Sequence, residues 1–148
     1  MMTYNVGSAD NKTNFAEVFT PAGVVFEMLY YVHNDIADID KTIFDPALGE
    51  GQFPCAELVL KMFYNVERLD EDLALRALRS LYGVDIQAAS VTKAHDHLLL
   101  TLQAAYKFFA GNDFTRLDEA REIIAENFYQ GDSIKLMKAW NEPQGSLF

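Results

Sequence analysis

The sequence predicts an α/β protein built on a partial doubly wound, Rossmann-like parallel sheet with strand order 3-2-1 and flanking helices. Three observations lead to this prediction. Short apolar segments alternate with longer segments whose apolar residues recur at helical spacing, which is typical of βαβ units. Each expected strand ends at or just before an acid, namely Asp45, Asp85 or Asp132. A turn containing Gly49 and Gly51 joins the first strand to a helix.

The chain of 148 residues is expected to form one domain. Half of its residues are hydrophobic, including 11 Phe and 7 Tyr, which is enough for a substantial core. Residues 1–14 are polar and predict a flexible arm, residues 15–140 the folded domain, and residues 141–148 a tail.

Each element has its own local signals. Thr20 is an expected N-cap and Pro21 suits the first helical position, while the acids of 70–72 favour a helix start. Phe53, Leu58, Met62 and Phe63 are the side chains that the second helix is expected to point inward. The expected elements are a helix over 15–31, a polar loop over 33–41, a buried strand ending at 43–44, helices over 51–66 and 69–81, a strand over 81–86, helices over 87–110 and 117–126, a strand over 127–130 and a short helix over 134–139.

The net charge of −10 excludes some functions. It comes from 22 acidic and 12 basic residues, and the basic ones form no stripe. Tight DNA binding relies on Lys and Arg near phosphates, so DNA is expected to be reached only through another domain or chain. An acidic surface that imitates DNA is an alternative.

Cysteine and histidine usage indicates neither a disulfide nor a metal site. The single Cys55 cannot form an internal disulfide, and it is expected to be a core thiol in a reducing cytoplasm. His95 and His97 are two residues apart on an expected helix, so they point about 200° apart and cannot share one metal ion. No apolar stretch approaches the ~20 residues of a membrane span, and the polar start of the chain lacks a signal-peptide pattern.

The turn from Asp45 to Phe53 reads Asp-Pro-Ala-Leu-Gly-Glu-Gly-Gln-Phe. A dinucleotide fingerprint would need a third glycine, where this chain has Pro54, and an acid about 20 residues further on. Asp85 lies well beyond that spacing. The turn therefore favours a smaller, mostly uncharged adenosine ligand, with Asp45 able to meet an ammonium group.

This turn resembles the S-adenosylmethionine (AdoMet) motif of the amino-methyltransferases that modify adenine in DNA. Three other segments resemble further motifs of that family, in the same order. They are Val18-Phe19-Thr20-Pro21 upstream, Tyr82 to Ile86 at the second strand, and Phe128 to Asp132 at the third. The resemblance covers roughly residues 15–138 and implies a cytoplasmic DNA-methylating transferase of the restriction–modification type, with AdoMet as cofactor.

The resemblance implies a role for each matching residue. Asp85 would hold the ribose hydroxyls, Asp132 would contact adenine, and Phe19 to Pro21 would cover the cofactor. The alternatives are a turn cap for Asp45, a helix cap for Asp85, a turn residue for Asp132, a core position for Phe53 and a simple helix start for Phe19 to Pro21. The implied cofactor-binding residues are Phe19, Thr20, Pro21, Asp45, Pro46, Ala47, Gly49, Gly51, Phe53, Asp85, Ile86 and Asp132.

One family motif has no counterpart. The catalytic Asn/Asp-Pro-Pro-aromatic segment should follow Gly131-Asp132, and Trp140 to Gln144 does not supply it. No catalytic residue is therefore assigned. We expect the cofactor half of a methyltransferase, inactive alone. Its exposed first strand is expected to be covered by a catalytic half, by a second copy in a homodimer, or by residues 133–148 folding back. A non-catalytic interaction or regulatory protein of a mobile element or phage is the other alternative.

Overall fold

The structure is a computed structural model, and it describes residues 27, 29–31 and 33–140. The expected arm, most of the expected first helix and the tail lie outside these residues. The described elements are α3 (His33–Ala37), β1 (Ile43–Asp45), α4 (Gln52–Tyr64), a 3-10 turn (Val66–Arg68), α5 (Glu71–Arg79), β2 (Leu81–Asp85), α6 (Ala88–Ala110), α7 (Leu117–Asn127), β3 (Phe128–Gln130) and α8 (Ser133–Trp140).

The three strands form one parallel sheet in the order β1-β2-β3, with β2 in the centre. Ile43 pairs with Leu81, and Gly83 pairs with Phe128. The expected α/β class and parallel sheet are confirmed. Since the strands are parallel, their carboxyl ends lie at one edge of the sheet, and β1 is an outer strand of the described sheet.

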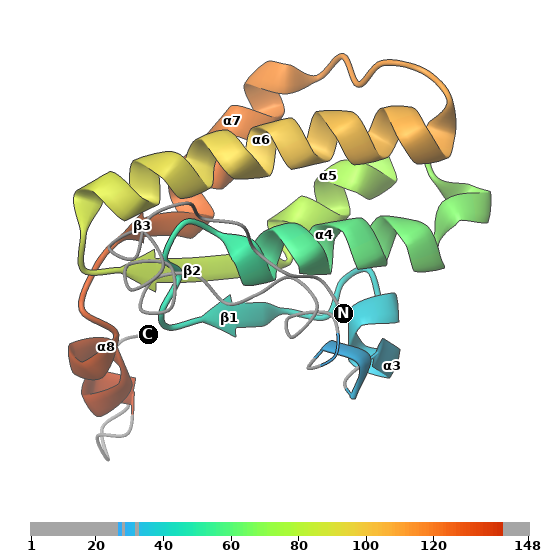
Figure 1. The fold of residues 1–148 in the computed structure, drawn as a ribbon. Helices are drawn as coiled ribbons and strands as arrows, with labels where there is room; N and C mark the ends of the chain where they lie inside the picture. The colour runs from blue at the N-terminus through green and yellow to red at the C-terminus, as the bar shows by residue number, and fades with distance from the viewer. Residues whose placement is uncertain (1–26, 28, 32, 141–148) are drawn as a thin grey trace, which may run out of the picture.

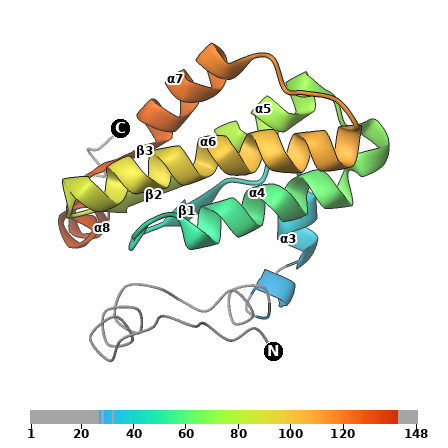
Figure 2. The ribbon, with the colours of Figure 1, turned by 45° about the horizontal axis from the view of Figure 1, so that its top comes forward.

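The helices α4, α5, α6 and α7 lie on one side of the sheet (Figures 1 and 2). Long α6 runs beside α4, and these two helices share the largest helix–helix contact. Leu58 and Met62 of α4 are fully buried there with Leu98 of α6, and the sheet adds Leu81 and Phe128 to the same cluster. Burial of a side chain of this size contributes about 1.5–3 kcal/mol. This core fixes the strands below the helices.

Helix ends follow from particular residues. Asp70 caps α5, because its Oδ1 accepts a hydrogen bond from the amide of Leu73 at 2.8 Å. Gly111 ends α6 with φ of 86°, which a residue with a side chain rarely adopts. Both ends lie where the sequence predicts a start or a stop.

The expected loop over 33–41 is wrong in part, because His33–Ala37 forms the short helix α3. Ile36 of α3 is buried. Side chains from α4 and from the C-cap residue of α4 donate to the carbonyls at the end of α3. Asn65 donates from Nδ2 to the carbonyl of Ala37 at 2.9 Å, and Lys61 donates from Nζ to that of Asp38 at 2.6 Å. A five-residue helix is not stable alone, so only these distant contacts reveal it.

Two predicted burials are also corrected. The strand β1 is half-buried rather than buried, since it is an outer strand. Phe63 does not point inward: it is 51% exposed and its ring packs against that of Phe109. Leu58 and Met62 are buried as expected.

Among the helices of the described part of the chain, none is long and apolar enough to cross a membrane.

Candidate functional site

Polar side chains gather at the carboxyl ends of the strands. Asp45 is the last residue of β1 and Asp85 the last of β2. The amide of Gly131 donates to the carbonyl of Asp85 at 2.9 Å, so Asp132 follows directly beside the end of β2. The sequence therefore identified a real cluster of strand ends, which is where open α/β sheets bind ligands.

Asp45 carries an oxygen with no partner among the described residues. Its Oδ1 accepts from the amide of Ala47 at 2.9 Å. Its Oδ2 is buried and accepts no hydrogen bond from this part of the chain. Burial raises the pKa of this carboxyl, the Ala47 amide lowers it, and the negative charge of Asp85 raises it further. A buried acceptor without a donor is costly, so an incoming cation or donor would stabilise it.

Asp85 joins three segments. Its Oδ2 accepts from the amide of Gly49 at 2.9 Å, and its Oδ1 accepts from the amide of Gln87 at 2.9 Å, just before α6. The helix-cap alternative for Asp85 is not confirmed, because the N-cap of α6 is Gln87 and Asp85 bonds the amide of that residue before the helix begins. A carboxylate oxygen can accept more than one hydrogen bond, so this arrangement leaves acceptor capacity for a ligand hydroxyl.

The glycine turn is pressed against the sheet. Gly49 and Gly51 have φ of 55° and 91°, which favour glycine. A Cβ on Gly51 would also lie 3.3 Å from that of Ala94. The amide of Leu48 donates to the carbonyl of Val84 at 2.9 Å, and its buried side chain packs over Gly83. The turn is thus held in shape by β2 and α6.

The other predicted residues contribute unequally. Asp132 caps α8, since its Oδ1 accepts from the amides of Ile134 at 3.0 Å and Lys135 at 3.3 Å. Phe53 is half-buried and packs against the cluster of Leu29, Ile36 and Ala56, as its core alternative predicts. Pro46, Ala47 and Ile86 are exposed at the strand ends, whereas Phe19, Thr20 and Pro21 lie outside the described residues.

Sequence reasoning missed Glu57. This acid lies on α4 and is only 5% exposed. Its pKa is raised to about 8, mainly by burial and in part by the charge of Asp45, against the opposing effect of Lys61. The available signal was a charged residue inside the apolar stretch from Pro54 to Phe63.

Lys61 follows Glu57 by one helical turn and is fully buried. Its ammonium donates to the carbonyls of Asp38 at 2.6 Å, Ile39 at 3.3 Å and Lys41 at 2.9 Å. These three acceptors match the three donors of an ammonium group. Burial lowers the pKa of Lys61, which nearby acids raise in part.

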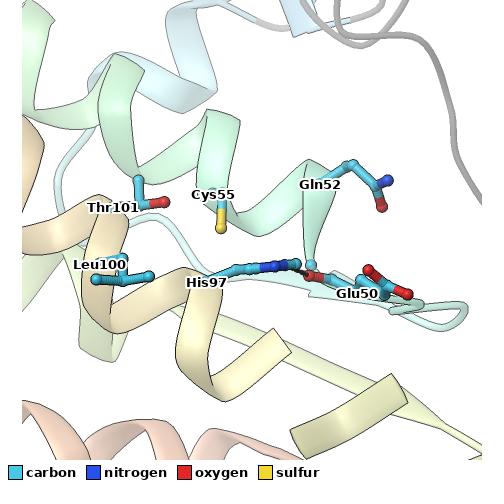
Figure 3. Close-up of a pocket in the computed structure, with 7 residues that line it drawn as sticks. Glu50, Gln52, Cys55, His97, Leu100 and Thr101 are labelled. Carbon is cyan, nitrogen blue, oxygen red and sulfur yellow. Dashed lines mark hydrogen bonds between the residues drawn. The ribbon is translucent and has the colours of Figure 1, made fainter. Parts of the chain in front are cut away.

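A hollow of about 310 Å³ lies beside the turn, between α4 and α6 (Figure 3). His97 donates from Nδ1 to the carbonyl of Glu50 at 2.8 Å, because a carbonyl can only accept. Burial raises the pKa of the Cys55 thiol to about 11, so it stays protonated and unreactive near neutral pH. The hollow is lined by Glu50, Gly51, Gln52, Cys55, His97, Leu100 and Thr101.

His95 has a different role from His97. It donates from Nε2 to the carbonyl of Phe128 at 2.6 Å, which ties α6 to β3. The two imidazoles therefore hold two different segments.

Comparison of the chain with models of known protein families, with curated proteins and with solved structures finds no significant match. Any family relationship rests on the four motif segments and on the geometry of the strand ends.

Proposed function

We propose that this chain is an AdoMet-binding domain of the adenine-specific DNA methyltransferase class, and that its sheet is one half of a doubly wound, Rossmann-like fold. The strand order supports the fold. When the strands follow one another across a parallel sheet in chain order, right-handed connections place all their helices on the same face, as α4 to α7 are placed here. The observation that carries the proposal is the pair of carboxylates, Asp45 and Asp85, on either side of the Gly49–Gly51 turn.

The charges at the strand ends favour AdoMet over a dinucleotide. A pyrophosphate would approach Asp45, Asp85 and Asp132, and like charges repel. AdoMet instead brings an ammonium and a sulfonium. Its ammonium would meet the unpartnered Oδ2 of Asp45, and its ribose hydroxyls would donate to Asp85.

Methyl transfer is not proposed for this chain alone. In the family that it resembles, the Asn/Asp-Pro-Pro-aromatic segment binds the flipped adenine, whose amine attacks the aligned methyl group. The sequence holds no such segment, and its charge of −10 is unfavourable for binding DNA. Both functions would come from another domain or chain. Incubation with labelled AdoMet and adenine-containing duplex should leave the DNA unlabelled, and label above background would contradict this.

Thermal unfolding with AdoMet tests the binding proposal. A ligand at about 100 times its dissociation constant should stabilise the chain by about 2.7 kcal/mol, and NAD should shift the melting temperature less. Asp85→Asn should weaken binding, whereas Asp113→Asn, at an exposed position beyond the end of α6, should not. Asparagine keeps one acceptor for the turn, which makes it a milder change than alanine. No shift at millimolar AdoMet would overturn the proposal.

A second candidate is a non-catalytic relative that has kept the fold but not the ligand. It is favoured by the backbone hydrogen bonds that Asp85 and Asp132 already accept, since each acid has a structural role without AdoMet. A folded chain whose melting temperature does not shift at millimolar AdoMet would favour this candidate.

A further inference from the structure

The negative charge of Asp45 acts on a second carboxyl group, that of the buried Glu57. Asp45 ends β1, and Glu57 projects from the second turn of α4. Asp45 has a buried Oδ2 without a partner, and Glu57 is 95% buried with no hydrogen bond among the described residues. Buried carboxyl oxygens are normally hydrogen-bonded, so Oδ2 of Asp45 is an exception that needs a cause.

Among the described residues, Lys61 is the one cation that acts on this pair, and it acts on Glu57 alone. Lys61 is the nearest candidate, one turn after Glu57, but three backbone carbonyls occupy its ammonium. The other titratable groups near Glu57 are Asp45 and the neutral thiol of Cys55. Two acids, Asp38 and Asp40, raise the pKa of Lys61. Asp85 raises the pKa of Asp45. None of them neutralises an ionised Glu57 other than Lys61.

We propose that Asp45 and Glu57 together receive the ammonium group of the adenosine ligand, and that Glu57 releases a proton when the ligand binds. This inference rests on the proposed AdoMet function and adds to it a specificity-determining residue that lies outside the resembling motifs. Before binding, Glu57 is protonated and the ligand is a cation. After binding, ionised Glu57 is paired with the ligand cation, and the proton has passed to the buffer.

The free protein holds Glu57 mostly protonated at neutral pH, because its pKa is raised to about 8. For a ligand that requires ionised Glu57, the apparent affinity is the intrinsic affinity multiplied by the fraction of Glu57 that is ionised. Affinity should therefore rise by up to about tenfold per pH unit between pH 6 and 7. The ammonium of the ligand stays protonated in this range, so the rise reports the protein.

Calorimetry of AdoMet binding at pH 7, in buffers of different ionisation enthalpy, measures the protons released. We expect close to one proton per AdoMet and per S-adenosylhomocysteine, since both carry the ammonium, and none for methylthioadenosine, which lacks it. Glu57→Gln, nearly the same shape, should abolish the release and flatten the pH dependence. Glu126→Gln changes the net charge equally at an exposed position of α7 and should alter neither.

The outcomes separate the two proposals. AdoMet binding without proton release, or release that persists in Glu57→Gln, would overturn the role of Glu57 and leave the AdoMet site standing. Absence of binding by all three adenosine ligands would overturn the site itself and this inference with it. Thermal unfolding of Glu57→Gln shows that any loss of release occurs in a folded protein.

Discussion

Gly83 allows the glycine turn to approach the sheet. It lies in the centre of β2, and a Cβ there would be 2.9 Å from Cδ1 of Leu48 and 3.2 Å from Cδ1 of Phe128. Both of those side chains are buried, so neither has room to move freely. The absence of a side chain at this position therefore lets the turn pack on the strands.

We predict that Gly83→Ala destabilises the protein by about 1–3 kcal/mol, the usual cost of overpacking a core. Urea denaturation measures this loss. The matched control is Gly131→Ala, whose Cβ would lie 3.5 Å from its nearest neighbour and whose φ is not positive. Its effect should stay within about 0.5 kcal/mol. Equal stability of the two variants would show that Leu48 adapts without cost.

Glu57 also predicts how stability depends on pH. Its pKa is about 8 in the folded state and near 4.5 without burial, so the folded protein binds the extra proton between these values. Stability from this group is complete below about pH 4.5 and is lost as pH rises through 8. We predict that Glu57→Gln raises the melting temperature at pH 8 more than at pH 5. A gain that is equal at both pH values would contradict the burial of an ionisable group here.

The sequence predicts individual residues best where a backbone motif demands them. Asp45, Asp85 and the two glycines belong to a strand–turn–helix pattern, and the structure brings them together. Glu57 was missed, because helical spacing alone does not show which neighbour a buried charge faces. Phe63 was misplaced for a related reason: the inward stripe of α4 depends on how α6 lies against it.

Among the elements, α5 depends most clearly on its cap. It is short, with nine residues, and Asp70 satisfies the amide of Leu73. We predict that Asp70→Ala costs about 0.5–2 kcal/mol. Chemical denaturation measures it, with Glu122→Ala at an exposed position of α7 as the control. A loss no larger than that of the control would show that packing alone holds α5.

Elements with strong local signals were predicted closely, and α3 was not. Long α6 has a glycine stop and helical periodicity throughout, and it begins and ends within one residue of the expected bounds. Short α3 depends on Lys61 and Asn65, which lie more than 20 residues away. Local pattern cannot include such contacts, so the segment looked like a loop.

At the scale of the whole molecule, the sheet has a second face. Leu81 and Phe128 point into the core beneath the helices, so the residues that follow them, Tyr82 and Tyr129, point to the opposite side. Phe44 pairs with Tyr82 and lies on the same face. Tyr129 is 41% exposed there. The described helices α4 to α7 do not cover this face (Figure 1).

We predict that the chain self-associates, because an apolar face beside an outer strand is an association site unless it is covered. Light scattering at micromolar concentration should show a dimer, the closed symmetric form that is commonest. Tyr129→Lys should shift it towards monomer. Phe108→Lys places the same charge at a more exposed aromatic position on α6 and should not. A wild-type monomer at every concentration would contradict the prediction.

The pressed glycine turn has a consequence for the rate of ligand capture. Leu48 and Gly49 are already bonded to β2 through the carbonyl of Val84 and the carboxylate of Asp85. Because the turn is already held in its bound shape, ligand binding needs no slow ordering of this turn. The rate of association is therefore limited by the encounter of ligand and protein. Stopped-flow mixing with an adenosine ligand should give one phase whose rate rises linearly with ligand concentration. A plateau at high concentration would mean that some other segment must first rearrange.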